Sequence, residues 1–234
     1  MERNTRGLIL RKFAHMFLAL LLLLPLYIRD IANQLIPVVL PKQINYMLSP
    51  GVIYAQLLFW AAIMNAFRVK RPIPESRLRE IRQKARELPI GKRIEEIVDS
   101  VEKTIRLMMR EYEWKAGYFG LVNGTIGVAV AYLLVGHHVF YGVLAMATTD
   151  VYSSLIGSLF GKHKMPFSNG SVEGLIAGFM SYFAVLTFLT SSDMACFLAA
   201  IASLVELYGI EDNLSIPVVV SIVSKLLELA PPWI

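Results

Sequence analysis

Long apolar runs dominate this chain of 234 residues and limit its fold more than any other feature. Seven runs approach the length of a membrane-crossing helix, which needs about 20 mostly apolar residues; they cover 13–28, 51–67, 116–135, 139–160, 172–190, 194–210 and 216–230. Apolar residues make up 56% of the chain and charged residues only 18%, too few charges for the polar coat of a soluble enzyme. We therefore expect an all-α, polytopic membrane helix bundle with about seven transmembrane helices, in a single domain over 1–234.

The excess charge of the chain is gathered in one block, residues 68–115. This block holds 14 Lys and Arg against 9 Asp and Glu, an excess of +5 that equals the formal charge of the whole chain. Basic excess marks the cytoplasmic loops of membrane proteins. Apolar residues recur in the block at helical spacing, so we expect a cytosolic amphipathic helical hairpin; the alternative is a dimerising coiled coil, and hence a homodimer. Alternating charge signs and flanking apolar runs argue against a nucleic-acid partner.

The basic N-terminal residues predict a retained first helix that starts in the cytoplasm. Residues 31–48, interrupted by Pro37 and Pro41, are expected to form an interfacial or re-entrant piece. The alternation of the runs then makes the protein multi-pass, with its active site on the cytoplasmic face. Four polar clusters meet on that face: Arg11, Lys12 and His15; Lys162, His163 and Lys164; Ser171 and Glu173; Glu206, Asp212 and Asn213.

Four acidic residues lie inside or at the edge of apolar runs: Asp150, Glu173, Glu206 and Asp212. A carboxylate in hydrocarbon costs roughly 2.5–3.5 kcal/mol on insertion scales, so each should be paired or hydrated. Asp150, near the middle of its run, is expected to face a polar cavity beside a cation. Several carboxylates on one face are typical of a Mg²⁺ site, here Asp150, Glu173 and Asp212. The alternative is that some only cap or pair, as Glu173 would with Ser171.

One face of the helix that begins at Asp150 changes from acidic to small and then to basic residues. Asp150, Ser154, Gly157 and Gly161 share one side, followed by Lys162 and Lys164. Small residues let a phosphate or a neighbouring backbone approach, and lysines neutralise phosphate charge. The glycines alone are equally typical of helix packing. No Walker P-loop and no HExxH sequence occur, and the pair His137–His138 is expected to form an interfacial turn.

Three ordered motifs resemble the polyprenol kinase family, which includes dolichol kinase, phytol kinase and the CTP-dependent diacylglycerol kinase. The first is Arg11-Lys12-Phe-Ala-His15. The second is Asp150, Ser153, Gly157 and Gly161, then Lys162-His163-Lys164 and Asn169-Gly170-Ser171-Val172-Glu173-Gly174. The third is Glu206, then Asp212-Asn213 and Pro217. Ser153 stands where the family has Ala, and Asn169-Gly170 where it has a Lys pair, so that Lys162, Lys164, Arg11 or Lys12 would take over the phosphate contacts.

The resemblance implies a lipid-alcohol kinase that transfers the γ-phosphoryl group of CTP, or of another nucleoside triphosphate, to a polyprenol- or dolichol-like isoprenoid alcohol with Mg²⁺. The nucleotide- and metal-binding core would span 139–217. Catalytic residues would be Asp150, Glu206 and His15. Nucleotide-binding residues would be Arg11, Lys12, Ser153, Ser154, Gly157, Gly161, Lys162, Lys164, Ser171, Glu173, Gly174 and Asn213. Two alternatives remain: a cytidylyltransferase that forms a CDP-lipid, and a non-enzymatic membrane transporter, for which buried acids would form a cation or proton path.

Overall fold

The computed structural model describes residues 2–35, 42–70, 100 and 119–232, and every element named in these ranges is helical, with no strand among them. The all-α prediction is therefore confirmed for this part of the chain. In order, the helices are α1 (Glu2–Leu21), α2 (Leu24–Leu35), α3 (Lys42–Met47), α4 (Pro50–Lys70), α8 (Phe119–Val135), η1 (Gly136–His138), α9 (Val139–Ala145), η2 (Met146–Asp150), α10 (Val151–Phe160), α11 (Val172–Leu186), α12 (Ser192–Tyr208) and α13 (Asp212–Leu226).

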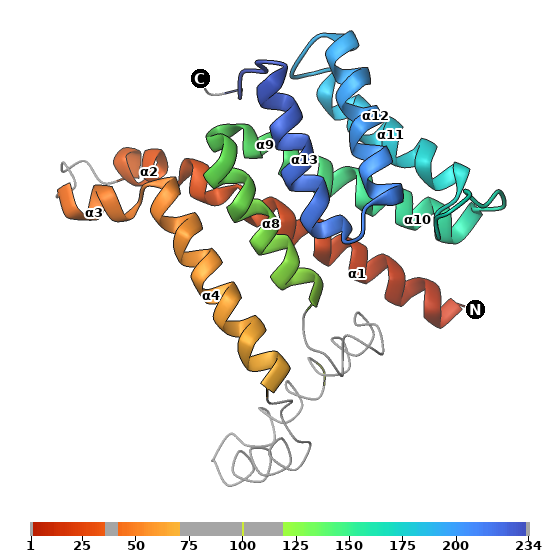
Figure 1. Ribbon diagram of the computed structural model, residues 1–234, viewed down its shortest axis with the longest axis horizontal. Helices are drawn as coiled ribbons and strands as arrows, with labels where there is room; N and C mark the ends of the chain where they lie inside the picture. Colours follow the sequence, from red (N-terminus) through yellow and green to blue (C-terminus); the bar gives the residue numbers. More distant parts are fainter. Residues whose placement is uncertain (1, 36–41, 71–99, 101–118, 233–234) are drawn as a thin grey trace, which may run out of the picture.

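The C-terminal helices form the centre of the bundle (Figure 1). Helix α13 packs against α8, α9 and α12, while α11 packs between α10 and α12. Helix α1 lies across η2 and α10, so the beginning of the chain contacts its middle. Helix α4 packs mainly on α8 and extends away from α11 and α12.

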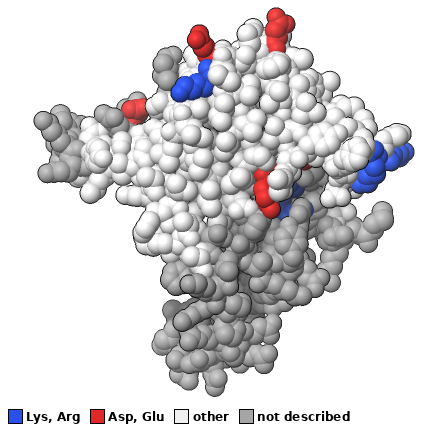
Figure 2. Space-filling view, in the orientation of Figure 1, with Lys and Arg blue, Asp and Glu red and all other residues white. Residues whose placement is uncertain are grey.

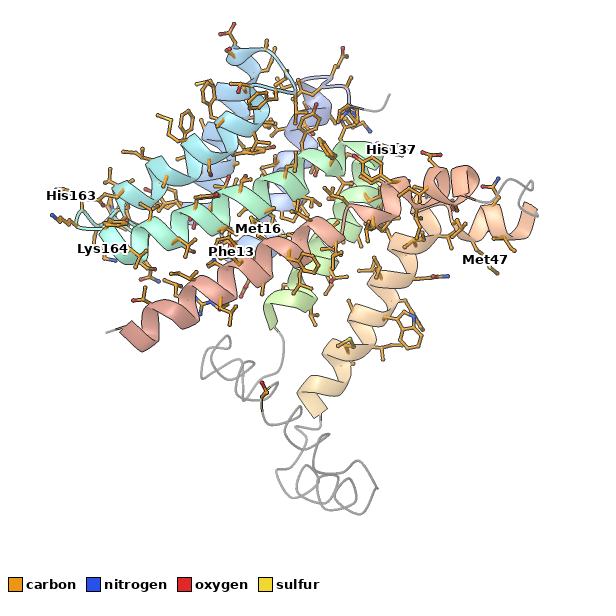
Figure 3. All side chains as sticks on the ribbon, turned by 180° about the vertical axis from the view of Figure 1, so that it is seen from behind. Phe13, Met16, Met47, His137, His163 and Lys164 are labelled. Atoms are coloured by element: carbon orange, nitrogen blue, oxygen red, sulfur yellow. The ribbon has the colours of Figure 1, made fainter. Side chains whose placement is uncertain are left out.

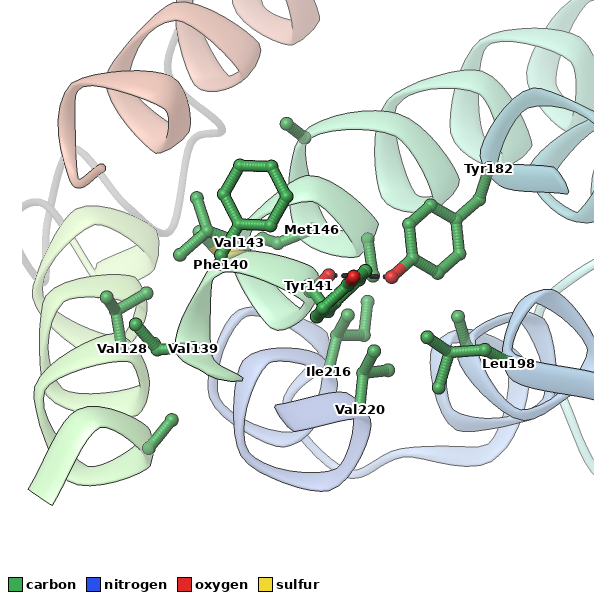
Figure 4. Close-up of a cluster of buried hydrophobic side chains, with 14 of the residues drawn as sticks. Val128, Val139, Phe140, Tyr141, Val143, Met146, Tyr182, Leu198, Ile216 and Val220 are labelled. Atoms are coloured by element: carbon green, nitrogen blue, oxygen red, sulfur yellow. Dashed lines mark hydrogen bonds between the residues drawn. The ribbon is translucent and has the colours of Figure 1, made fainter. Parts of the chain in front are cut away.

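The buried core lies where α8, α9, α11, α12 and α13 meet (Figure 4). Val143, Leu198 and Val220 are fully buried there. The Tyr182 hydroxyl donates to the Tyr141 carbonyl at 2.8 Å, and the Tyr141 hydroxyl donates to a carbonyl near the C-terminus at 2.7 Å. A buried tyrosine needs such a partner because its hydroxyl has left water. The two rings therefore fill apolar space without leaving their hydroxyls unpaired.

Glycines let α10 and α11 touch backbone to backbone. A Cβ added at Gly174 would lie 2.8 Å from the Ser153 carbonyl oxygen and 3.2 Å from the Gly157 Cα. A Cβ at Gly178 would lie 3.2 Å from the Thr149 carbonyl oxygen. The 2.8 Å distance is too short for any residue with a side chain, and the 3.2 Å distances leave very little room, so the helix-packing interpretation holds for Gly174 and for its contact with Gly157.

Most helix positions follow the apolar runs, with one correction near the N-terminus. The predicted break at 136–138 is confirmed: α8 ends at Val135 and α9 begins at Val139, with Gly136 in the left-handed region (φ +62°) between them. The run predicted over 13–28 lies within a candidate membrane span, Gly7–Ile28, but it is not one unbroken helix, because α1 ends at Leu21 and α2 begins at Leu24. Pro25 has no N–H to donate to the preceding turn, and its ring opposes continuation of the first helix.

Helix length supports membrane crossing at two places within the described ranges: Gly7–Ile28 and Val122–Phe160. Pro50–Met64 and Val172–Leu186 are apolar but shorter. These lengths do not establish the predicted count of seven spans. The predicted cytosolic hairpin at 68–115 falls almost wholly outside the described residues, and so do Pro37 and Pro41.

Candidate active site

Asp150 lies at the end of a π-helical turn, η2, inside the bundle. Only 1% of the surface of Asp150 is exposed to solvent. Helix α1 brings two basic side chains to it: Lys12 Nζ lies 2.8 Å from Oδ1, and His15 Nε2 lies 3.2 Å from Oδ2. Lys12 Nζ also lies 3.4 Å from the Asp150 carbonyl oxygen. The expectation that this buried acid sits beside a cation is confirmed, and the cation is Lys12. The expectation that Asp150 itself faces a polar cavity is not, because the polar cavity nearby is lined by other residues.

Asp212, at the start of α13, is an acidic neighbour of Asp150, and the charge of Asp150 acts on its carboxyl group. Burial, and then the negative charge of Asp150, raises the pKa of Asp212 to about 6. The Asn213 N–H donates to Asp212 Oδ1 at 2.7 Å, which fixes the carboxyl at the helix start.

Glu206 on α12 completes an acidic group that we call the acid cluster: Asp150, Glu206 and Asp212. Ser153 Oγ donates to Glu206 Oε1 at 2.5 Å and lies 3.5 Å from the Asp150 carbonyl oxygen. Ser153 therefore links Glu206 to the turn that carries Asp150. Residues far apart in the sequence, on α1, η2, α10, α12 and α13, meet at this one place.

A cavity of about 460 Å³ opens next to the acid cluster, and we call it the polar pocket. Its walls come from α10, the loop at 161–171, the start of α11 and the end of α12. The lining residues are Ser153, Ser154, Gly157, Ser158, Lys164, Phe167, Ser168, Asn169, Gly170, Ser171, Gly174, Leu175, Glu206, Leu207, Tyr208 and Gly209. Ser153 and Glu206 belong to both the pocket wall and the acid-cluster contacts, so the two features adjoin.

The loop at 161–171 folds back on itself as a short hairpin. Lys164 and Ser171 form an isolated antiparallel bridge, and the Met165 N–H donates to the Gly170 carbonyl at 3.2 Å. The Ser168 hydroxyl donates to the Leu207 carbonyl at 2.8 Å, which ties the loop to the end of α12. Figure 3 shows His163 and Lys164 at the projecting end of this loop. The loop thus forms an outer wall of the polar pocket.

The start of α11 points its positive end at the pocket. Ser171 caps the helix, since its Oγ accepts the Gly174 N–H at 3.1 Å. The N–H groups of Val172 and Leu175 also have backbone partners. An anion in the pocket would therefore feel the helix dipole, while its direct donors would be hydroxyls and Lys164.

Glu173 faces away from the acid cluster, toward the loop. Its Oε1 lies 2.7 Å from His163 Nδ1, and this hydrogen bond chiefly lowers the pKa of Glu173 to about 2. The described residues contain no group of three or more His, Cys, Asp or Glu that could hold a metal ion. The predicted metal trio is therefore not assembled: Asp150 and Asp212 meet, and Glu173 is held by His163 instead.

The structure brings together half of the predicted nucleotide-binding residues. Those that line the polar pocket are Ser153, Ser154, Gly157, Lys164, Ser171 and Gly174. Those that do not line it are Arg11, Lys12, Gly161, Lys162, Glu173 and Asn213. The reasons are visible for two of them: Lys12 is held by Asp150, and Gly161 packs on Ser171, whose Cβ would lie 2.9 Å from a Cβ added there.

Sequence reasoning missed several lining residues, among them Ser158, Phe167, Ser168 and Tyr208. One signal was present in the sequence: Ser168-Asn-Gly-Ser171 is a dense polar run between two apolar helices. No comparable signal marks Phe167 or Tyr208, because an aromatic residue beside a helix end usually packs inward.

Comparison with known proteins adds no relative to this description. No family model matches the chain, and neither the characterised proteins nor the solved structures yield a significant match.

Proposed function

We propose that this protein is a multi-pass membrane phosphotransferase that moves the γ-phosphoryl group of a nucleoside triphosphate, CTP by resemblance, to the hydroxyl of an isoprenoid-like lipid alcohol. The observation that carries the proposal is the position of Glu206. This carboxylate lines a polar pocket of about 460 Å³ and is joined through Ser153 to a buried cluster of acids. Phosphoryl transfer requires a pocket for the nucleotide, a carboxylate near the acceptor hydroxyl and a group that attracts cations, here the acid cluster.

The apolar surface supports placement in a membrane. Large apolar side chains are well exposed on several helices, including Phe17 (61%), Trp60 (60%) and Phe188 (90%). On the face shown in Figure 2, the described residues are mostly uncharged, and their charged side chains form a few small separate groups. Soluble monomers rarely show such extensive apolar surface. A lipid bilayer is the solvent that suits it, and residence there gives access to a substrate that does not enter water.

The polar pocket suits a triphosphate. Its volume lies in the range of small-molecule sites, roughly 300–1,000 Å³. Hydroxyls of Ser153, Ser154 and Ser168, together with the Lys164 ammonium, offer donors around it. The N-terminal end of α11 adds a positive partial charge. These groups favour a phosphate chain lying between α10 and the loop.

Glu206, rather than Asp150, is positioned to accept the proton of the alcohol. Asp150 is 1% exposed, does not line the pocket and already contacts Lys12, His15 and Asp212. Glu206 lines the pocket, and the Ser153 hydroxyl orients its Oε1. A base must reach the proton that it takes. Lys12 and His15 then act by holding Asp150.

The described residues hold no preformed metal site of three or more ligands, so a Mg²⁺ would have to enter with the nucleotide and take most of its ligands from the phosphates and from water. Asp150 and Asp212 supply adjoining carboxyl oxygens, and Mg²⁺ is commonly held by one or two carboxylates together with substrate phosphates. The ion would supply charge neutralisation on the phosphates. It is expected at this pair and not at Glu173, whose carboxylate is bound to His163.

The test is an assay of the purified protein in detergent or nanodiscs with Mg²⁺, γ-labelled CTP or ATP and a panel of lipid alcohols. Label entering the lipid supports the kinase. Release of pyrophosphate with CMP entering the lipid would assign the chain to the cytidylyltransferases instead. No transfer from any nucleotide, by protein shown to be folded, rejects the proposal.

The Glu206→Gln variant tests the assignment of the base. We expect transfer to fall by about 10²–10⁴-fold, the usual contribution of a general base, while nucleotide binding persists. The matched control is Glu211→Gln, since Glu211 lies just after the helix that carries Glu206, contacts Asn123 at 3.4 Å and does not line the pocket. Full activity of Glu206→Gln would remove the base from this position.

A further inference from the structure

Phe167 occupies an unusual position at the mouth of the polar pocket. Its side chain is fully exposed (102%) and yet contributes to the pocket lining. Its backbone is left-handed (φ +60°), a conformation that is unfavourable for an L-residue and that a bulky aromatic rarely adopts. An aromatic ring is thus held out of the core and beside a polar cavity, where packing among the described residues does not explain it.

The two ends of the pocket differ in chemistry. One end has Glu206 and Ser153, next to the acid cluster, and the loop that carries Phe167 and Asn169 forms the outer wall. If Glu206 takes the alcohol proton, the reacting γ-phosphate must lie at the Glu206 end. The α- and β-phosphates then lead outward past Lys164, and the nucleoside comes to the loop.

We propose that Phe167 is the stacking platform for the base of the nucleotide, an inference that rests on the proposed function. Aromatic rings stack on any base, and each stacked base contributes about 1–3 kcal/mol to binding. The loop is fixed for this task by the Ser168–Leu207 hydrogen bond at 2.8 Å and by the Met165–Gly170 backbone bond. The ring therefore recognises the nucleoside and contributes nothing to a bare phosphate chain.

The experiment compares the binding of Mg²⁺–CTP with that of Mg²⁺–tripolyphosphate, by calorimetry, in wild type and in three variants at position 167. Phe167→Ala and Phe167→Leu are expected to weaken CTP binding by about 5- to 150-fold, the loss of one stacked base. Phe167→Tyr keeps the ring and is expected to keep the affinity. Tripolyphosphate should bind all four proteins equally. The control Ile210→Ala removes another fully exposed apolar side chain (101%) outside the pocket lining and should change neither affinity.

A fluorescent variant distinguishes the nucleotide from the membrane as the partner of this side chain. In Phe167→Trp, measured as the difference from wild type with its three native tryptophans, CTP should quench the added signal and tripolyphosphate should not. Quenching by nanodiscs with brominated acyl chains, without a response to CTP, would overturn the inference and make Phe167 a lipid anchor. Unchanged CTP affinity in Phe167→Ala would also overturn it. A wild type that binds neither CTP nor tripolyphosphate rejects the proposed function itself.

Discussion

Two pairs of oppositely ionisable side chains at nearly equal distance have different surroundings. Lys12 and Asp150 approach to 2.8 Å with side chains 8% and 2% exposed, whereas His163 and Glu173 approach to 2.7 Å with side chains 77% and 26% exposed. The first pair joins α1 to η2 inside the bundle. The second closes the loop over the start of α11. Distance alone therefore says little about what each pair does for the protein.

The environment decides the consequence of losing a partner. A buried charge without its counter-ion keeps the full cost of leaving water, typically about 3–5 kcal/mol. An exposed pair exchanges its partner for water and salt, and its loss is nearly free. The buried pair should therefore determine stability, and the exposed pair should affect only the loop.

The largest effect is expected for Lys12→Met. This change leaves Asp150 buried without its ammonium, so we expect the free energy of unfolding to fall by about 3–5 kcal/mol. The measurement is denaturant or thermal unfolding in one fixed detergent. The double variant Lys12→Met/Asp150→Asn, which removes both charges, should lose distinctly less than the single variant. Equal losses in the two proteins would show that the ion pair is not the source of the effect.

A second effect, of intermediate size, concerns the pH dependence of stability. The pKa of Asp212 is raised to about 6 in the folded protein against 3.8 in the unfolded chain. Its contribution to stability is therefore fully present below about pH 4 and is lost as pH rises through about 6, a change on the order of 3 kcal/mol. Unfolding between pH 4 and pH 8 in EDTA should show this decline in wild type, and Asp212→Asn should flatten it. A variant with the wild-type slope would place the titrating group elsewhere.

The smallest effect is expected at the exposed pair. The pKa of Glu173 is lowered to about 2 by its hydrogen bond to His163, so the contact holds the loop above the ordinary glutamate pKa of 4.5 and is lost as pH falls toward 2. At neutral pH, His163→Ala should leave the unfolding midpoint of the whole protein unchanged within error. Limited proteolysis should detect faster cleavage in 161–171, because the loop loses a tie. A loss of stability as large as that of Lys12→Met would contradict the comparison between the two pairs.

The sequence predicts the need for a partner better than it predicts the partner. A carboxylate in the middle of an apolar run must be neutralised, and that argument correctly places a cation beside Asp150. It does not select Lys12, which is 138 positions away, because the choice depends on how α1 crosses η2. The same long-range packing separates Glu173 from the acids with which it was grouped: its neighbour in space is His163, only ten positions away.

Local chemistry was more informative for helix boundaries than for the site. Gly136 marks a turn that sequence reasoning located correctly, while Pro25 breaks a run that hydropathy alone treats as continuous. Phe167, by contrast, is a site residue that sequence patterns do not reveal. Its exposure follows from the hairpin of the loop and from the left-handed backbone, neither of which a hydropathy pattern contains.

The order of residues along the chain has a consequence for biosynthesis. The ammonium at position 12 is synthesised 138 residues before the carboxylate that it neutralises. When the ribosome delivers the segment with Asp150, α1 has already been synthesised and can receive it, so the acid need not wait unpaired for later helices. Translation thus produces Lys12 before Asp150, the acid that is costly to bury without a partner.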